Sequence, residues 1–118
     1  MTAPSTEGQR REAQALAHLQ AAGLRLRASN VRYRFGELDL VMDDGAELVF
    51  VEVRYRRSSR LGGAAGSVGP AKQQRLWRAA QTYLDSQPGL SQRPCRFDVV
   101  AIEGDGRIDW IRDAIRDL

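Results

Sequence analysis

The sequence has little of the chemistry that many enzyme classes need. Its 118 residues include one cysteine, Cys95, which excludes an internal disulfide and any cysteine-based zinc site. The only histidine, His18, lies in a helical pattern and is expected to face solvent, so a Ser-His-Asp or Cys-His hydrolase is excluded. No apolar run approaches the roughly 18 residues of a membrane span, and the N-terminus lacks the core of a signal peptide. We therefore expect a cytoplasmic protein with no membrane partner.

Acidic residues are also missing from one long stretch of the chain. Hydrophobic content of 42% and charged content of 28% describe a globular protein, and the length fits a single domain over residues 1–118. No acid occurs between Val53 and Leu84, where the basic residues are Arg54, Arg56, Arg57, Arg60, Lys72, Arg75 and Arg78. Such a stretch indicates a polyanionic partner such as nucleic acid. A solvated helix face beside a basic loop explains the charge equally well, and arginine-rich genomic composition explains the scarcity of lysine.

Helix and strand patterns alternate along the chain. Thr6 and Gln9 fit a capping box at the start of a first helix, and Pro70 fits the first turn of a second one. Residues 1–5 and the glycine-rich loop 58–69 are expected to be flexible. We expect helices at 7–22 and 70–86, strands at 24–35, 36–42, 47–56, 96–102 and 108–111, and a helical turn within 112–118. This order predicts an α/β or α+β sandwich with a central mixed sheet flanked by helices.

Charged residues interrupt both strands of the predicted hairpin. If residues 43–46 form the turn, Met42 pairs with Glu47, and Asp39 and Glu52 become diagonal neighbours. Side chains repeat every second residue, so one face of the sheet is expected to hold Glu37, Asp39, Phe50, Glu52 and Arg54. Three carboxylates on one face repel each other unless a positive charge lies between them. The pattern therefore predicts a site for a divalent cation.

Simpler structural roles stay open for these residues. Glu37 can pair with an arginine of the preceding strand, and Asp39 and Glu52 can be exposed strand residues. Asp98, in the apolar strand at 96–102, is expected to form a salt bridge, with Arg96 as the nearest candidate. The two tryptophans, Trp77 and Trp110, are expected in the core or at an interface rather than as stacking platforms for bases.

Taken in chain order, Glu12, Asp39 and Glu52-Val53-Arg54 resemble the PD-(D/E)XK nuclease arrangement, close to its archaeal Holliday-junction resolvase branch. More specifically, the chain resembles the YraN-like family of uncharacterised bacterial proteins, whose endonuclease role is inferred from that superfamily. Gly-Glu-x-Asp followed by Phe-Val-Glu-Val is specific in combination. The resemblance covers nearly the whole chain and is carried by residues 8–12, Ala15, Leu19, Asn30, 36–40, 49–53, Lys72, Ala80, 83–84 and 96–100.

This resemblance implies a restriction-endonuclease-like three-layer fold and a metal-dependent endonuclease that acts on DNA, branched or structured DNA included. It implies that Asp39 and Glu52 hold Mg²⁺ or Mn²⁺, with the Val53 carbonyl as a further ligand. Glu12 would add a carboxylate through water, and Glu37 would support the ligands. The implied catalytic residues are Asp39, Glu52, Arg54, Glu12 and Lys72, and the residues expected to bind DNA are Arg56, Arg57, Arg60, Lys72, Arg75 and Arg78. Junction-cutting relatives are dimers, so a homodimer is expected by analogy.

Two positions depart from the family pattern. The family has lysine where this chain has Arg54, and arginine keeps the charge but is too basic to accept a proton. Lys72, near the start of the second helix, is a candidate to replace that lysine. Arg11 stands where the family usually has glycine and is expected to narrow access near Glu12. These departures favour a second hypothesis, a catalytically weak or inactive module that keeps the fold and binds nucleic acid or a protein partner.

Overall fold

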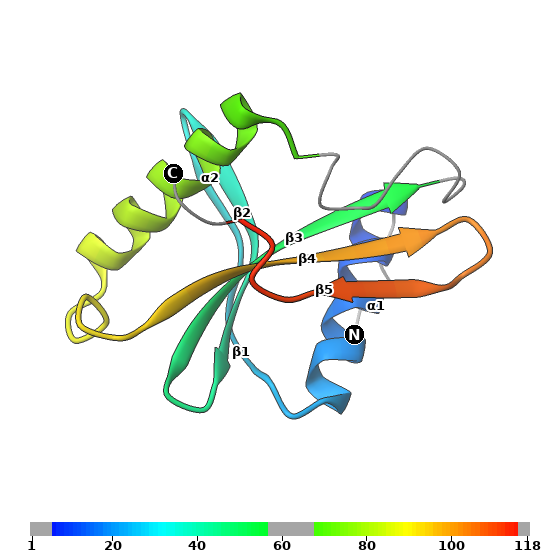
Figure 1. Ribbon diagram of the computed structural model, residues 1–118, viewed down its shortest axis with the longest axis horizontal. Helices are drawn as coiled ribbons and strands as arrows, with labels where there is room; N and C mark the ends of the chain where they lie inside the picture. Colours follow the sequence, from blue (N-terminus) through cyan, green and yellow to red (C-terminus); the bar gives the residue numbers. More distant parts are fainter. Residues whose placement is uncertain (1–5, 57–67, 116–118) are drawn as a thin grey trace.

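The computed structural model of the chain describes residues 6–56 and 68–115 (Figure 1). The flexibility expected for residues 1–5 and for most of the 58–69 loop concerns residues outside these ranges. Residues 112 and 113 form a turn in which Asp113 has a φ of 53°, not the expected helical turn, and residues 116–118 of that prediction lie outside the described ranges. In chain order the elements are α1 (Glu7–Ala21), β1 (Arg25–Tyr33), β2 (Gly36–Asp44), β3 (Glu47–Arg56), α2 (Pro70–Ser86), β4 (Cys95–Glu103) and β5 (Ile108–Ile111).

Local signals in the sequence set the helix ends. The Thr6 hydroxyl accepts a hydrogen bond from Gln9 N, and the Gln9 side chain accepts one from Thr6 N, so the capping box is confirmed. Pro70 occupies the first turn of α2, where its missing N–H costs nothing. Neither of the helices in the described ranges combines the length and apolar character that a membrane span requires.

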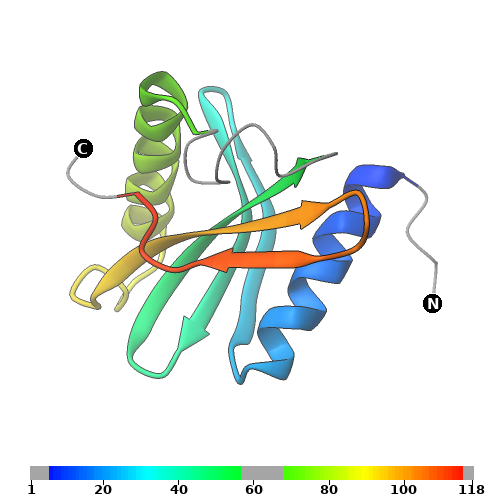
Figure 2. The ribbon, with the colours of Figure 1, turned by 45° about the vertical axis from the view of Figure 1, so that its right-hand side comes forward.

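The strands form one sheet in the order β1-β2-β3-β4-β5, with a parallel pair only between β3 and β4. Figure 2 shows α1 and α2 on opposite sides of this sheet. On the α1 side, Ala15 and Leu19 pack against strand residues such as Val51. On the α2 side, Leu76 and Ala79, for example, pack in one cluster with Phe50. The expected α/β architecture is confirmed, and it is consistent with a restriction-endonuclease-like three-layer fold.

The β2–β3 hairpin has a different register from the predicted one. Asp44 pairs with Glu47, and Met42 pairs with Val49 instead of Glu47. The loop is therefore only Gly45 and Ala46, which is possible because Gly45 adopts a φ of 62° that glycine tolerates without strain. A register shift of two residues does not by itself move a side chain to the other face, and Asp39 and Glu52 still lie close enough to share a hydrogen bond.

Alternation of side chains breaks in the middle of β1 and β2. Leu38 and Val41, three residues apart, both pack on the α2 side, although strict alternation would place them on opposite faces. In β1 the break coincides with Asn30, a non-glycine residue with a φ of 52°. As a result Glu37 lies on the α1 side, within reach of Glu12, rather than on the face of Phe50. The prediction of one shared face is wrong for Glu37.

A buried carboxylate joins β4 to β5 and to the end of the chain. The Asp98 side chain is fully buried and accepts hydrogen bonds from Trp110 Nε1 and Asp113 N, each 2.9 Å long. Arg96 Nε donates to it over 3.0 Å, so the expected salt bridge is confirmed. Trp110 packs against the core as expected, whereas Trp77 contacts Phe97 and stays 41% exposed.

Candidate functional site

Strands β2 and β3 separate after the Leu40–Val51 pair. From there β2 continues its pairing with β1, and β3 continues its parallel pairing with β4 as far as Arg56. Asp39 lies where the two strands part, and its Oδ2 accepts a hydrogen bond of 2.8 Å from Val53 N. A side-chain oxygen thus takes the place of a main-chain acceptor. Figure 1 shows that β2 and β3 diverge beyond their paired stretch.

A cavity of about 360 Å³ opens at this fork. Acidic side chains from α1, β2 and β3 share its lining with basic side chains from α1, β3 and α2. The charged residues that line it are Glu12, Glu37, Asp39, Glu52, Arg11, Arg54, Lys72 and Arg75. The structure therefore brings together every residue predicted to be catalytic, together with Val53.

Three of the carboxylates form a cluster. Oxygen atoms of Glu12, Glu37 and Asp39 all lie within 4.8 Å of one another. Burial raises the pKa of Glu12, and the negative charge of Glu37 adds to this effect, while a hydrogen bond with Asn30 opposes it. Glu37 also pairs with Arg32 of the preceding strand at 3.3 Å, so its expected structural partner is present as well.

Asp39 is the most strongly perturbed acid of the cavity. Burial raises the pKa of Asp39 to about 8, and both the hydrogen bond with Glu52 and the negative charge of Glu52 contribute to this rise. The hydrogen bond from Val53 N acts in the opposite direction and does not offset these effects. Without a cation, burial and the neighbouring negative charge therefore favour the protonated form of the Asp39 carboxyl, which shares a hydrogen bond with Glu52.

Two basic side chains of the cavity lie next to Glu52. Lys72 Nζ lies 2.8 Å from Glu52 Oε2, and Arg54 Nη1 lies 3.8 Å from the same oxygen. Glu52 is only 5% exposed, and this oxygen is buried without a well-directed hydrogen bond, so charge rather than geometry holds the contact with Lys72. Lys72, the candidate to replace the family lysine, thus lies next to Glu52, one of the predicted metal ligands.

Arg11 lies along the cavity wall beside Tyr55. Its guanidinium carbon is 3.6 Å from the centre of the Tyr55 ring, and its Nη2 is 3.1 Å from Glu7 Oε2. The side chain is therefore held between α1 and the end of β3, next to Glu12. It occupies space at the rim that glycine would leave open, in line with the expected narrowing.

The sequence profile of the uncharacterised protein family UPF0102 matches residues 11–102. The chain belongs to this family. A UPF0102 protein of Xanthomonas campestris pv. campestris is 58% identical over 106 residues, 89% of this chain and 87% of the relative. For a UPF0102 protein of Pseudomonas fluorescens the identity is 53% over 111 residues, 91% of this chain and 90% of the relative. A UPF0102 protein of Nitrosococcus oceani is 51% identical over 113 residues, which are 93% of this chain and 91% of the relative.

Membership of UPF0102 confirms the YraN-like resemblance. The matched range contains all of the acidic and basic residues of the cavity, from Arg11 to Arg75. The family description states no activity, so any chemistry has to be argued from the site itself.

The donor set of this UPF0102 site fits a hard divalent cation. Its acidic donors are all carboxylate oxygens, which Mg²⁺ and Mn²⁺ prefer. Their spacing of up to 4.8 Å is close to the roughly 4.2 Å between opposite ligands of octahedral Mg²⁺. The buried Glu52 oxygen, which lacks a directed hydrogen bond, is a further donor at the same cavity. Glu37 joins the predicted ligands Asp39 and Glu52 as a direct candidate.

The residues predicted to bind DNA lie in three different surroundings. Lys72 and Arg75 line the cavity, and Arg78 lies over the Phe35 ring. Arg56 pairs with Glu103 of β4 and with Asp109 of β5, so its charge is engaged within the protein. The remaining two, Arg57 and Arg60, lie outside the described residues.

Sequence reasoning missed two aromatic residues near the site. Tyr55 lines the cavity and Phe35 contacts Arg78, and the sequence patterns predict a role in the site for neither residue. The arginines that stack on these rings are Arg11 for Tyr55 and Arg78 for Phe35. Both are far from their aromatic partners in the sequence, so no local signal could have found these contacts.

Proposed function

We propose that the chain is a metal-dependent endonuclease that hydrolyses phosphodiester bonds in DNA, branched or structured DNA included. The observation that carries the proposal is the position of Asp39 between Glu12 and Glu37 on one side and Glu52 on the other. Buried carboxylates this close together favour a divalent cation in place of the proton that Asp39 otherwise keeps. Basic side chains that line the same cavity suit a phosphate group.

In this proposal each residue has a defined role. When bound, Mg²⁺ or Mn²⁺ supplies a water of lowered pKa and neutralises charge that builds on the phosphate. Asp39 and Glu52 hold the cation, and the Val53 carbonyl is a third donor. Glu12 contributes from α1 through water, and Glu37, balanced by Arg32, either donates directly or supports the other carboxylates.

Lys72 and Arg54 bind and stabilise the phosphate. Both nitrogens already lie near Glu52 Oε2, so a phosphate oxygen that enters the cavity meets two cations at once. Arginine stays protonated throughout the working pH range, so Arg54 acts as an electrostatic stabiliser and not as a base. Lys72 supplies from α2 the compact ammonium that the family pattern has at position 54.

A cleavage assay tests the proposal. The purified protein is incubated with linear, nicked and branched DNA in Mn²⁺, in Mg²⁺ and in EDTA. We expect cleavage that depends on the metal and is lost on chelation, because the carboxylates alone cannot activate water. Absence of cleavage on all three substrates with either metal would contradict the proposal.

Arg54→Lys provides a second test. Lysine at this position restores the compact ammonium of the family pattern, and we expect the cleavage rate in Mn²⁺ to rise by about 3- to 10-fold. Arg93→Lys, which changes an arginine at the hairpin end of the sheet, is the matched control and should leave the rate unchanged. Equal rates for Arg54→Lys and the parent protein would show that Arg54 does not impair the chemistry.

A nucleic-acid-binding or partner-binding module that has lost most catalysis is the second candidate. The observation in its favour is that arginine occupies position 54 while Lys72 neutralises Glu52. Binding of DNA in EDTA without cleavage under any metal condition would favour it. Both candidates include a cytoplasmic location and, by analogy with junction-cutting nucleases, a homodimer that sedimentation analysis can test.

A further inference from the structure

The first half of α2 carries three cations and no acid. Lys72, Arg75 and Arg78 follow one another at intervals of three residues, and Asp85, at the far end, is the only acidic residue of this helix. Successive members are about 4.5 Å apart along the helix axis, at 1.5 Å of rise per residue. The row begins at Glu52 in the carboxylate cavity and ends beside the β1–β2 turn.

Aromatic stacking holds the far end of this row. The Arg78 guanidinium carbon lies 4.1 Å from the centre of the Phe35 ring. Phe35 in turn stacks on Tyr33, with ring centres 5.5 Å apart and planes only 8° from parallel. A cation held over a stacked aromatic pair loses less side-chain freedom when it binds an anion than a freely rotating arginine does.

The β1–β2 turn is tightly packed on α2. A Cβ atom added at Gly36 would lie 3.0 Å from the main-chain oxygen of Arg75, so the two backbones are in direct contact. Gly36 and Arg75 also line the carboxylate cavity. Phe35, Arg78 and the cavity are therefore fixed relative to one another.

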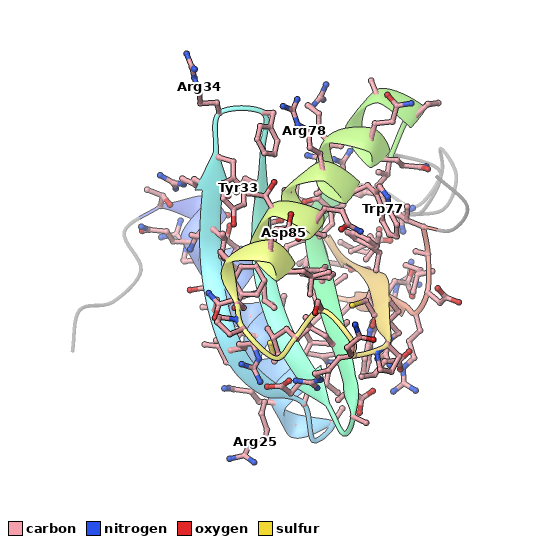
Figure 3. All side chains as sticks on the ribbon, turned by 90° about the vertical axis from the view of Figure 1, so that its left-hand side faces the viewer. Arg25, Tyr33, Arg34, Trp77, Arg78 and Asp85 are labelled. Carbon is pink, nitrogen blue, oxygen red and sulfur yellow. The ribbon has the colours of Figure 1, made fainter. Side chains whose placement is uncertain are left out.

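Arg34 extends this basic surface at the tip of the turn. Figure 3 shows Arg34 and Arg78 at the same end of the molecule, with Arg25 at the opposite end. Among the residues that the structure describes, no carboxylate forms an ion pair with Arg34, Arg75 or Arg78. Three uncompensated arginines beside a carboxylate cavity attract a polyanion. We call Arg34, Phe35, Arg75 and Arg78 the α2 ridge.

We propose that the α2 ridge binds the phosphate backbone of the nucleic-acid strand that enters the cavity, with Phe35 as the positioning residue that holds Arg78 on a phosphate. The inference rests on the proposed function and extends it by giving the strand a path, from Lys72 over Arg75 and Arg78 to Arg34. A phosphate backbone is favoured over an acidic protein because the row of cations starts at Lys72 in the carboxylate cavity, where the proposed function places a phosphodiester.

Binding measured without cleavage tests this path. A fluorescein-labelled DNA duplex with a single-stranded overhang is titrated in EDTA at several salt concentrations. We expect Arg78→Gln to weaken binding about 5- to 10-fold at about 0.1 M salt and to lower the slope of log affinity against log salt by about 0.9. Arg78→Lys should keep most of the slope. Arg25→Gln, the matched control, should stay within about 2-fold of the parent protein.

A double-mutant cycle tests the role of Phe35. Phe35→Leu keeps an apolar side chain but removes the ring, and we expect a loss of about 3-fold in affinity. In the Arg78→Gln background the same change should have no effect, because the arginine that Phe35 holds is then missing. Thermal unfolding of each variant checks that the fold is intact.

Three results would overturn the inference. Arg78→Gln could bind as tightly as the parent protein, or Phe35→Leu could weaken binding equally in both backgrounds. Polyglutamate could also displace the labelled DNA as well as unlabelled DNA does, which would assign the ridge to an acidic protein. Since all of these are binding measurements in EDTA, a protein that never cleaves DNA can still confirm the ridge, and an active nuclease can still lack it.

Discussion

Asp39→Asn is expected to lower metal-dependent DNA cleavage by about 100-fold or more and, at the same time, to stabilise the metal-free fold. Asparagine loses the negative charge that would hold the cation. It keeps an oxygen to accept the hydrogen bond from Val53 N, and its amide can donate to Glu52 as the protonated carboxyl does. The fold is therefore preserved while the proposed chemistry is removed.

The stabilisation depends on pH. The pKa of Asp39 is about 8 in the folded protein, against 3.8 for an unperturbed aspartate. Between these values the unfolded chain releases the proton while the folded chain keeps it, so this group lowers the stability as pH rises from about 4 to 8. The asparagine of the variant does not titrate and has no such cost. In EDTA we expect Asp39→Asn to be more stable than the parent at pH 8, with about 5 kcal/mol as the upper bound that the two pKa values set, and to show little of this gain near pH 4.

Urea unfolding at both pH values measures this difference, and Asp43→Asn on the same strand is the matched control. Asp43 is ion-paired with Arg27 and Arg93 at the other end of β2. Burial would raise the pKa of Asp43, but hydrogen bonds from the two arginines lower it, so its charge stabilises the fold above about pH 4 and is lost in acid. Asp43→Asn should cost about 1 kcal/mol at pH 8. An Asp39→Asn protein that cleaves normally, or is destabilised like the control, would contradict the site.

Asp98→Ala is expected to have the largest effect on stability, a loss of about 3–5 kcal/mol. The substitution leaves Trp110 Nε1 and Asp113 N without their acceptor and removes one partner of Arg96, whose side chain is 11% exposed. Unmatched donors in the interior each cost about 1–3 kcal/mol. Denaturant unfolding of the two proteins at pH 7 measures the loss.

Asp85→Ala on the exposed side of α2 is the control for this measurement and should lie within about 0.5 kcal/mol of the parent. The loss of stability in Asp98→Asn should fall between those of Asp98→Ala and Asp85→Ala. The asparagine side chain still accepts one hydrogen bond, but it lacks the negative charge opposite Arg96. A loss below about 1 kcal/mol for Asp98→Ala would mean that the hydrogen bonds at this carboxylate contribute little.

Parts of the fold that depend on local signals could be predicted from the sequence. The helix starts follow from Thr6 and Pro70, whose effects act within one turn. The hairpin register could not, because Asp-Gly is compatible with more than one loop length. The proximity of Asp39 to Glu52 survived that error, since the two side chains still share a hydrogen bond.

The rest of the site depends on tertiary structure. The left-handed conformation of Asn30 and the break in alternation set the side of the sheet on which Glu37 lies. No local sequence pattern predicts either feature. Lys72 reaches Glu52 across twenty residues of chain. The family resemblance suggested Lys72 as a replacement for the lysine at position 54, but it did not predict this contact. The exposed position of Trp77 also went against the usual preference of large apolar side chains.

The fork between β2 and β3 has a consequence for the substitutions that the site can accept during evolution. Each strand at the fork is held from its outer side, β2 by β1 and β3 by β4, so main-chain hydrogen bonds keep the opening in place. Most side chains inside the fork are therefore not needed to hold the sheet together. Such a scaffold tolerates the exchange of one charged residue at a time, and arginine at position 54 beside a lysine on α2 is the kind of substitution that it permits.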